Sequence, residues 1–326
     1  VRVKKLRDRL NHHNYRYYVL DSPELMDAQY DELMIELRAL EQEFPQLVTL
    51  DSPTQRVGAN PVDRFNTVAH PLPMLSLTNA FTHEELIAWH KRVSSAVLNS
   101  TFDMVCELKF DGLAVALTYE NGIFARGATR GNGYQGEDIT LNLRTIHSIP
   151  LRVPVSAPAK FEVRGEVYMT KSGFDMLNRQ RMDAGEPVYV NPRNTAAGSV
   201  RQLDPRVTSE RPLDIFVYNL GHVEGSVPDN HWDTMAYLSS LGFRLNPLSA
   251  HVKRIEEVET YFKNWCMIDG KNCQEAVADG GSYGLSGALY EHEIHSCSNS
   301  NISDCGTLVI ETRYSDTEFL RDTIKF

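Results

Sequence analysis

The sequence predicts an α+β protein in which a small helical hairpin precedes a body of antiparallel strands with flanking helices. Two observations carry this prediction. Residues 2–45 space their apolar side chains at helical intervals, whereas the chain from residue 113 alternates with a period of two and contains an Asn-Gly turn. With 326 residues, 42% hydrophobic and 23% charged, the chain is long enough for about two domains.

Residues 2–45 are predicted to form two helices separated by a proline turn at 21–23 (DSP). The second helix carries an apolar stripe at i, i+3, i+4, i+7 and i+10: Tyr30, Leu33, Met34, Leu37 and Leu40. The polar stretch 51–61 (DSPTQRVGANP), which bears proline at both ends, predicts a linker. Thr82 and Glu85 then match a T-x-x-E capping box, which predicts a helix to about Val97.

The sheet is predicted to begin near residue 113. Larger and smaller side chains alternate over 113–118, and Asn121-Gly122 is typical of a type I′ hairpin turn. A second strand at 161–169 (FEVRGEVYM) places one set of side chains on a face that is either solvent-exposed or part of a site: Glu162, Arg164, Glu166 and Tyr168. Further helices are predicted at about 171–184, 231–241 and 255–265, with an apolar strand at 213–220.

Charge and hydropathy exclude several classes of protein. A net charge of −10 argues against a chain that binds nucleic acid over its whole surface, but it does not exclude a local basic patch. The first ten residues (VRVKKLRDRL) have no apolar core of a signal peptide, and no later stretch approaches ~18 apolar residues. We therefore expect a soluble cytoplasmic protein, and the missing initiator Met indicates a fragment.

Lys109 stands out in 106–112 (CELKFDG), because a charged side chain in a predicted β-hairpin costs more than a neutral one. Side chains two apart on a strand share a face, so Lys109 and Asp111 are expected to project together, and Gly112 lets a ligand approach closely. The simplest interpretation of K-x-D-G alone is a surface ion pair between Lys109 and Asp111.

The alternative is that Lys109 is a nucleophile. A lysine nucleophile must be neutral, yet an unperturbed ammonium, with a pKa of about 10.4, leaves only about one side chain in 10³ neutral at pH 7. Burial or neighbouring cations lower such a pKa, and three candidate cations follow in the sequence: Arg130, Arg193 and Arg201.

Three further motifs follow Lys109: 127–133 (GATRGNG), 164–166 (RGE) and 193–201 (RNTAAGSVR). Each is weak by itself. Together with a lysine nucleophile they describe a nucleotidyl-transfer site. In such a site the lysine attacks an α-phosphate, the arginines neutralise phosphate oxygens, and carboxylates hold a metal or a ribose hydroxyl.

In this combination the chain resembles the amino-terminal part of the bacterial NAD-dependent DNA ligases, from about residue 5 to residue 263. The resemblance is carried by ordered motifs along most of the chain: 15–37 (YRYYVLDSPELMDAQYDELMIEL), 51–59 (DSPTQRVGA), 73–77 (PMLSL), 107–122 (ELKFDGLAVALTYENG), 128–140 (ATRGNGYQGEDIT), 145–151 (TIHSIPL), 162–169 (EVRGEVYM) and 191–205 (NPRNTAAGSVRQLDP).

The resemblance implies a helical domain at 1–58 that recognises the nicotinamide mononucleotide (NMN) half of NAD, followed by an adenylation (nucleotidyltransferase) domain at 59–280. The family's NMN-contact positions fall on Tyr17, Tyr18, Asp27, Tyr30 and Asp31, although Tyr30 also fits core packing. Lys109 is implied as the adenylated lysine. The NAD site is implied to be lined by Ser76, Leu77, Glu107, Arg130 and Glu166, with Asp111, Arg193 and Arg201 supporting phosphate and metal chemistry.

The implied reaction uses NAD and Mg²⁺. Lys109 takes the AMP group, NMN leaves, and the AMP later passes to a 5′-phosphate at a nick, so that nicked duplex DNA is the implied partner. This chain alone is expected to be a monomer that binds such DNA weakly, since much of the DNA-encircling surface of the family lies in domains beyond this region. No membrane partner is expected.

The resemblance ends at Gly280. The family has a D-G-V-V-x-K motif here and a later W-A-x-x-x-K-F-P-A segment, and each supplies a lysine, whereas residues 281–284 read GSYG. Residues 281–326 are therefore interpreted as a divergent tail. We favour a shifted reading frame or a disordered segment over a metal site built from Cys266, Cys273, His292, His295, Cys297 and Cys305, because these spacings contain no C-x-x-C.

Three functional hypotheses follow from these patterns. The first is self-adenylation at Lys109 by NAD. The second is a catalytically dead remnant that binds NAD without chemistry. The third is an ATP-using nucleotidyltransferase of the ligase and capping-enzyme type, which the helical hairpin argues against because ATP has no nicotinamide half to recognise.

Overall fold

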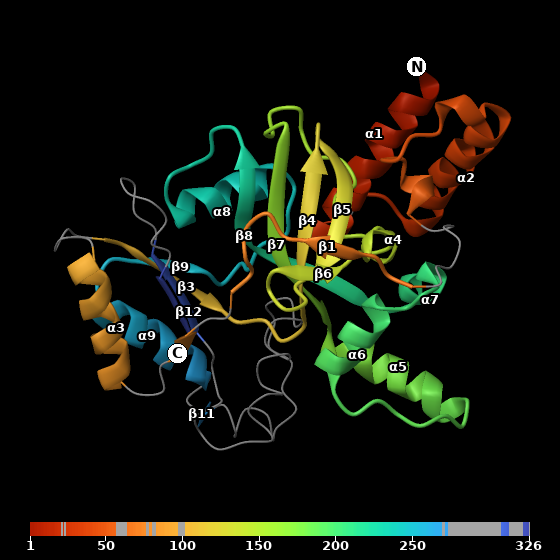
Figure 1. Cartoon of the computed structure of the whole chain (residues 1–326). Coiled ribbons are helices and arrows are strands. Elements are labelled where there is room, and N and C mark those ends of the chain that lie inside the picture. The colour runs from red at the N-terminus through yellow and green to blue at the C-terminus, as the bar shows by residue number, and fades with distance from the viewer. Residues whose placement is uncertain are drawn as a thin grey trace.

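The computed structural model describes residues 1–20, 22, 24–56, 64–75, 78–79, 83–96, 102–268, 271–272, 308–312 and 322–325 (Figure 1). Among them, only the backbone is described for 27–28, 78–79, 262–268, 271–272 and the last two ranges. The architecture mixes helices with mostly antiparallel sheets behind an amino-terminal helical hairpin, which confirms the predicted α+β class.

The helical hairpin consists of α1 (Arg2–Asn14) and α2 (Asp27–Glu43), with one π-helical turn, η1 (Tyr15–Val19), between them. Both helices were predicted. Their shared core is small and apolar, with Leu6, Leu10 and Leu37 at most 1% exposed. The hairpin lies on the β5 side of the central sheet (Figure 1).

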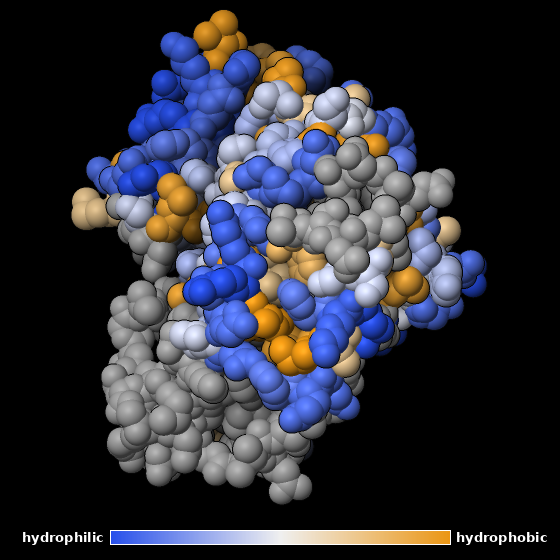
Figure 2. Space-filling view, turned by 90° about the vertical axis from the view of Figure 1, so that its left-hand side faces the viewer, coloured by the Kyte–Doolittle hydropathy of each residue, from blue (hydrophilic) through white to orange (hydrophobic). Residues whose placement is uncertain are grey.

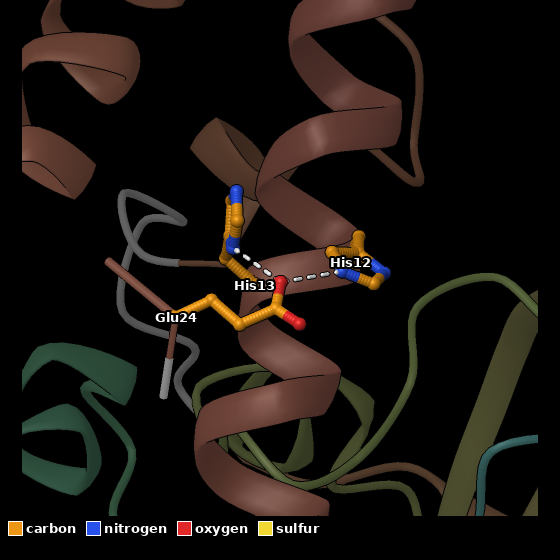
Figure 3. Close-up of side chains that lie close together, drawn as sticks. All are labelled: His12, His13 and Glu24. Carbon is orange, nitrogen blue, oxygen red and sulfur yellow. Dashed lines mark hydrogen bonds and ion pairs between the residues drawn. The ribbon is translucent and has the colours of Figure 1, made fainter. Parts of the chain in front are cut away.

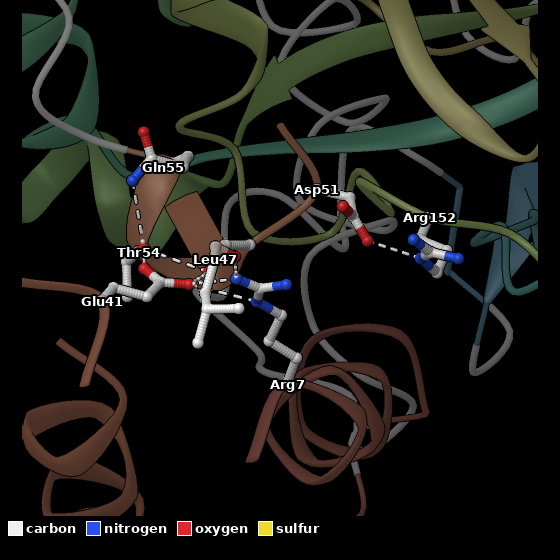
Figure 4. Close-up of polar contacts among 8 residues, drawn as sticks. Arg7, Glu41, Leu47, Asp51, Thr54, Gln55 and Arg152 are labelled. Carbon is white, nitrogen blue, oxygen red and sulfur yellow. Dashed lines mark hydrogen bonds and ion pairs between the residues drawn. The ribbon is translucent and has the colours of Figure 1, made fainter. Parts of the chain in front are cut away.

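The chain after α2 is anchored to the hairpin through Glu41, a carboxylate that is 5% exposed (Figure 4). Arg7 donates from Nη2 to Glu41 Oε1 at 2.7 Å, and Ser52 Oγ donates to the same oxygen at 2.7 Å. Thr54 donates to the other oxygen. Two short 3₁₀ turns follow α2 in this segment, η2 (Pro45–Leu47) and η3 (Pro53–Gln55).

The first half of the predicted linker, 51–56, is a packed segment, so the linker prediction is wrong there. Arg56 is 6% exposed and donates to the carbonyl oxygens of Arg144, Ile146 and Ile149, each at 3.0 Å. Buried carbonyl groups need donors, and the guanidinium supplies several from one side chain. Residues 57–61, the rest of the linker, lie outside the described residues, and the domain boundary at 58 stays a prediction.

The central sheet has four antiparallel strands in the order β5-β4-β7-β8. Their bounds are β4 (Leu113–Glu120), β5 (Ile123–Thr129), β7 (Lys160–Met169) and β8 (Leu213–Glu224). The predicted hairpin turn is confirmed, because Asn121 and Gly122 adopt φ values of 50° and 77° between β4 and β5. Both values lie in the left-handed region that a type I′ turn requires.

One face of the central sheet packs on the main apolar core. Val115, Leu117 and Val163 from the strands meet Met235 and Leu238 of α8 (His231–Ser240) in this core. The short α4 (Thr140–Leu143) and the loop after it complete it.

The other face of β7 carries Glu162, Arg164 and Glu166, at 3%, 7% and 9% exposed. The solvent-exposed interpretation of this face is therefore wrong. Buried charged groups need partners, so this face is a polar interior.

A second sheet has the strand order β2-β13-β12-β3-β9. Its strands are β2 (Thr78–Asn79), β3 (Met104–Leu108), β9 (Ala250–Val252), β12 (Leu308–Thr312) and β13 (Asp322–Lys325). Two predicted helices, α3 (His83–Ala96) and α9 (Ile255–Cys266), pack on one face of it through Trp89, Met104, Cys106 and Tyr261. Two segments of the predicted tail are thus strands, and β12 pairs antiparallel with β3.

The remaining elements are short. They are β1 (Thr67–Ala69) paired with β6 (Gln135–Glu137), β10 (Met267–Ile268) paired with β11 (Lys271–Asn272), and the helices α5 (Lys171–Asp183), α6 (Pro192–Val200) and α7 (Pro205–Ser209). The helix α5 was predicted, whereas α6 and α7 were not.

In the part of the chain that the structure describes, no helix combines the length and apolar character needed to cross a membrane. Polar side chains cover most of the described surface on the face shown in Figure 2. Most ligands of the tail metal site considered above lie outside the described residues: Cys273, His292, His295, Cys297 and Cys305. Only the backbone of Cys266 is described.

Candidate active site

Lys109 lies at the crossover between the two sheets. β3 ends at Leu108 and β4 begins at Leu113, and these strands belong to different sheets. The prediction that Lys109 sits within a hairpin strand is therefore wrong, because the chain leaves one sheet here to enter the other. The half-buried Lys109 donates from Nζ to the Phe110 carbonyl oxygen at 3.1 Å.

A stack of three aromatic rings fixes the backbone next to Lys109. The Phe110 ring is 6% exposed and stacks on Phe216 with ring centroids 4.4 Å apart. Tyr168 stacks on Phe216 in turn, with centroids 5.1 Å apart. Because Phe216 and Tyr168 come from β8 and β7, the stack holds the crossover against the polar face of the central sheet.

Glu166 on β7 is a buried carboxylate that interacts electrostatically with Lys109. Burial raises the pKa of Glu166 to about 7, against the opposing attraction of Lys109 and Arg193 and a hydrogen bond from the Gly112 backbone N–H. Glycine is required at 112, since a Cβ there would lie 2.1 Å from the Val167 carbonyl oxygen. The close approach therefore brings Glu166 against the crossover.

Asp111 and Arg193 form an ion pair beside Lys109. Arg193 Nη1 donates to Asp111 Oδ1 at 2.8 Å, with 53% and 29% of the two side chains exposed. Arg193 is presented by the first turn of α6, where Asn191 caps the helix by accepting from the Asn194 N–H and Pro192 takes the first helical position. The structure thus brings Lys109, Asp111, Glu166 and Arg193 together.

The other two candidate arginines have partners of their own. Arg201 makes a two-pronged contact with Glu137, with Nη2 2.7 Å from Oε1, and this pairing raises the pKa of Arg201. Arg130 donates from Nε to the Met74 carbonyl oxygen at 2.9 Å. Arg130 therefore holds the segment that leads to Ser76 and Leu77, which lie outside the described residues.

Arg164 also supports that segment. It donates to the carbonyl oxygens of Leu72 and Pro73 at 2.6 and 3.0 Å, and its Nε donates to Glu162 at 2.9 Å. Arg164 was not among the candidate arginines Arg130, Arg193 and Arg201. Its burial and its three partners make it a residue that positions the 72–75 loop.

Glu107, at 5% exposed, has a donor on each carboxylate oxygen. The His231 Nε2 lies 3.2 Å from Oε2, and Ser249 Oγ donates to Oε1 at 2.9 Å. Neither partner was predicted. They lie 124 and 142 positions further along the chain, and no local motif marks them.

The NMN-contact candidates lie on the helical hairpin. Tyr17 is 48% exposed, and its ring centroid lies 4.7 Å from that of Tyr18. Tyr18 stacks on His147 at 4.6 Å, and burial lowers the pKa of His147 to about 4, so the stack is between neutral rings. Tyr30 packs against the hairpin core and donates to Asn14 Oδ1 at 2.8 Å.

The two carboxylates of the NMN-contact set lie on α2. Asp31 is exposed, whereas Asp27 begins α2 and has no described side chain. The structure therefore places the candidates in two groups, one on the hairpin and one around the crossover.

Among the residues that the structure describes, one cluster gathers three residues of metal-ligating types: His12, His13 and Glu24 (Figure 3). His12 Nε2 and Glu24 Oε2 are 3.0 Å apart, with half of each side chain exposed, and Arg16 pairs with the other oxygen at 3.1 Å. Arg16 already neutralises the carboxylate, so the cluster is an ion-pair network that ties α1 to the chain before α2.

Two family models match the chain. The NAD-dependent DNA ligase adenylation domain matches residues 62–280, and the DNA ligase-like, N-terminal NAD⁺-binding domain matches residues 1–58. The chain belongs to the NAD-dependent DNA ligase family. Its adenylation-domain match covers the crossover at Lys109, and its NAD⁺-binding match covers the helical hairpin.

Curated relatives agree with this assignment. A DNA ligase of Dehalococcoides mccartyi strain BAV1 is 54% identical over 295 residues, which cover 90% of this chain and 43% of the relative. A DNA ligase of Desulforudis audaxviator is 53% identical over 266 residues, which cover 81% of this chain and 40% of the relative. The chain therefore spans less than half the length of these relatives.

Solved structures give weaker likenesses. The ATP-dependent DNA ligase from bacteriophage T7 in complex with ATP has a TM-score of 0.33 at 11% identity, covering 77% of this chain and 67% of that one. The Pnkp1/Rnl/Hen1 complex has a TM-score of 0.37 at 10% identity, covering 81% and 75%. TM-scores below 0.5 do not establish a shared fold.

Proposed function

We propose that Lys109 is the nucleophile that NAD adenylates in this member of the ligase family. The observation that carries the proposal is the crossover itself, where Lys109 stands beside Glu166 and the Asp111–Arg193 pair. Lys109 can attack a phosphorus atom once it is neutral, and the arginine and the two carboxylates can hold phosphate oxygens, a ribose hydroxyl or a metal.

The step is a nucleotidyl transfer. Lys109 first loses a proton to solvent, and the Nζ lone pair then forms a bond to the α-phosphorus of the AMP half of NAD. The bond from that phosphorus to the bridging oxygen breaks, and its electron pair leaves with NMN. The attached nitrogen then loses a second proton, which leaves AMP-lysine.

The residues around Lys109 suit the groups of a nucleotide. Arg193 can move from Asp111 to a phosphate oxygen, because both partners are partly exposed and the pair is held by one hydrogen bond. Glu166, with its pKa raised to about 7, can accept from a ribose hydroxyl when ionised. The exposed Tyr17 and Asp31 offer a ring and a carboxylate to the cationic nicotinamide.

Magnesium fits this site through phosphate rather than through a protein cage. The carboxylates beside Lys109 are Asp111 and Glu166, and no set of three ligating side chains gathers there among the described residues. Mg²⁺ usually binds through one or two carboxylates plus substrate phosphates and water. When bound, it would offset charge on the phosphate oxygens.

The same proposal extends to nick sealing. AMP-lysine would pass its AMP to the 5′-phosphate of nicked duplex DNA, with the protein acting as a cytoplasmic monomer. With a net charge of −10 this chain is expected to bind such DNA weakly by itself, so adenylation of Lys109 is the step to test on the isolated chain.

Intact-mass measurement of the full 326-residue chain tests the proposal. After incubation with NAD and Mg²⁺ we expect one AMP adduct per chain, none with ATP, and none for Lys109→Arg, which keeps the charge but not the nucleophile. Lys160→Arg, at an ion pair with Glu120, is the matched control and should form the adduct. An adduct from ATP, or NAD binding without any adduct, would favour the ATP-using enzyme or the dead remnant instead.

A further inference from the structure

The Glu107 carboxylate faces the crossover and not the apolar core of its own sheet. On β3, Met104 and Cys106 pack into the core under α3 and α9. Side chains alternate along a strand, so Glu107 points to the face of β3 opposite the core, two positions before Lys109. A carboxylate that is 5% exposed on this face must be held by donors, because burial of an unpaired charge is costly.

Its two donors come from opposite halves of the body. His231 is the first residue of α8, whose Met235 and Leu238 pack in the core of the central sheet. Ser249 immediately precedes β9, and the β3–β9 register, with Cys106 opposite Ala250, continues to place Ser249 opposite Glu107. The carboxylate is therefore held by one donor from α8, which packs on the central sheet, and by one donor next to β9 of the second sheet.

Each oxygen of the Glu107 carboxylate can still accept a further hydrogen bond. A carboxylate has about four lone-pair positions, and His231 and Ser249 occupy one on each oxygen. Asn230 caps the helix that carries His231, which fixes the backbone of that donor. The single hydroxyl proton of Ser249 has two acceptors in reach, Glu107 Oε1 at 2.9 Å and the Asn246 carbonyl oxygen at 3.1 Å. The shorter contact goes to Glu107, so His231 and Ser249 together fix the orientation of its carboxylate.

We propose that His231 and Ser249 are positioning residues that hold the Glu107 carboxylate as a fixed hydrogen-bond acceptor for NAD bound beside Lys109. This inference rests on the proposed function. His231 and Ser249 contribute to nucleotide binding only through Glu107, and they touch no reacting atom. Loss of either donor therefore weakens NAD binding equally in the ground state and the transition state, which changes KM and leaves kcat alone.

The test is the rate of AMP-adduct formation by the full chain over a range of NAD concentrations. His231→Leu removes the donor and keeps a branched apolar side chain in its place. We expect the half-saturating NAD concentration to rise about tenfold, and the maximal rate to stay within about twofold of wild type. Ser249→Ala should shift it in the same direction. His231→Gln restores an N–H at similar reach and should stay within about threefold of wild type.

His222→Leu is the matched control, since His222 lies on β8 and contacts Glu224 at 3.6 Å with 38% of its side chain exposed. It should leave both parameters unchanged. Thermal unfolding of each variant separates misfolding from a binding defect, and if His231→Leu fails to fold, Ser249→Ala and His231→Gln decide. An unchanged half-saturating concentration in the folded variants, or a loss confined to the maximal rate, overturns the inference.

The outcome for wild type separates this inference from the proposed function. If wild type forms no adduct but binds NAD, the proposed chemistry fails. The positioning of Glu107 would still be supported by calorimetry if the Kd for NAD were higher for His231→Leu and Ser249→Ala than for wild type and His231→Gln. An equal Kd in all variants would overturn it. If wild type neither reacts with NAD nor binds it, both proposals fall together.

Discussion

Glu166 lies on β7 with 9% of its surface exposed, beside Lys109 and Arg193, and burial raises its pKa to about 7 from an ordinary value of 4.5. The folded chain therefore holds a proton that the unfolded chain gives up between these two values. Stability from this group is fully present below pH 4.5 and is lost as the pH rises to about 7.

Glu166→Gln should remove this loss. We expect the free energy of unfolding of the variant to exceed that of wild type by up to about 3 kcal/mol at pH 8, with the difference disappearing near pH 4. Urea unfolding at the two pH values measures it. Glu120→Gln, at an exposed ion pair, should show little change at either pH. A Glu166→Gln variant less stable than wild type at pH 8 would contradict the raised pKa.

Gly112 has a steric role that its neighbours define. Gly112→Ala places a Cβ 2.1 Å from the Val167 carbonyl oxygen, so β4 and β7 must separate beside Lys109. We expect destabilisation of roughly 1–3 kcal/mol, measured by urea unfolding, with a slower adenylation of Lys109. Gly198→Ala, inside α6 with nothing within 4 Å of its Cβ, should instead stabilise by about 0.5–1 kcal/mol. Equal effects of the two substitutions would argue against the close approach.

At the scale of elements, Arg56 joins the segment after the hairpin to the loop that follows α4. Arg56→Met leaves the carbonyl groups of Arg144, Ile146 and Ile149 without their donor. We expect a loss of about 2–4 kcal/mol in the free energy of unfolding. Arg206→Met, at an exposed pair with Asp204, should leave it nearly unchanged. A loss for Arg56→Met as small as that of the control would restore the interpretation of 51–56 as a free linker.

Elements with a local signal could be predicted. The helices α1, α2, α3, α5, α8 and α9 follow from apolar spacing and capping, and the β4–β5 hairpin follows from Asn121-Gly122. In α6 the signal was present and overlooked, since Asn191 is the cap and Pro192 the first helical residue. The role of Arg56 could not be predicted, because its acceptors lie about 90 residues away.

The site shows the same division. The sequence pointed to Lys109, Asp111, Glu166 and Arg193, and the structure brings these four together. It did not show that Lys109 lies between sheets, because β3 finds its partners β9 and β12 more than 140 positions later in the chain. His231 and Ser249 were missed for the same reason, since only long-range pairing places them on Glu107.

At the scale of the whole molecule, the crossover from β3 to β4 joins the two sheets at Lys109, and each sheet carries a buried carboxylate next to it. β3 supplies Glu107, β7 supplies Glu166, and the chain between the sheets supplies Lys109. A nucleotide between them would contact both halves of the body. The adenylation-domain match spans this crossover, which agrees with the proposal that Lys109 is the nucleophile.

Mapping the AMP group on the chain tests this account most directly. After incubation with NAD and Mg²⁺, the 326-residue chain is digested and its peptides are sequenced by tandem mass spectrometry. We predict AMP on the peptide that contains CELKFDG, at Lys109 and at no other lysine, with release of one NMN per AMP bound. AMP on another lysine, or NMN release with Lys109 unmodified, would contradict the account.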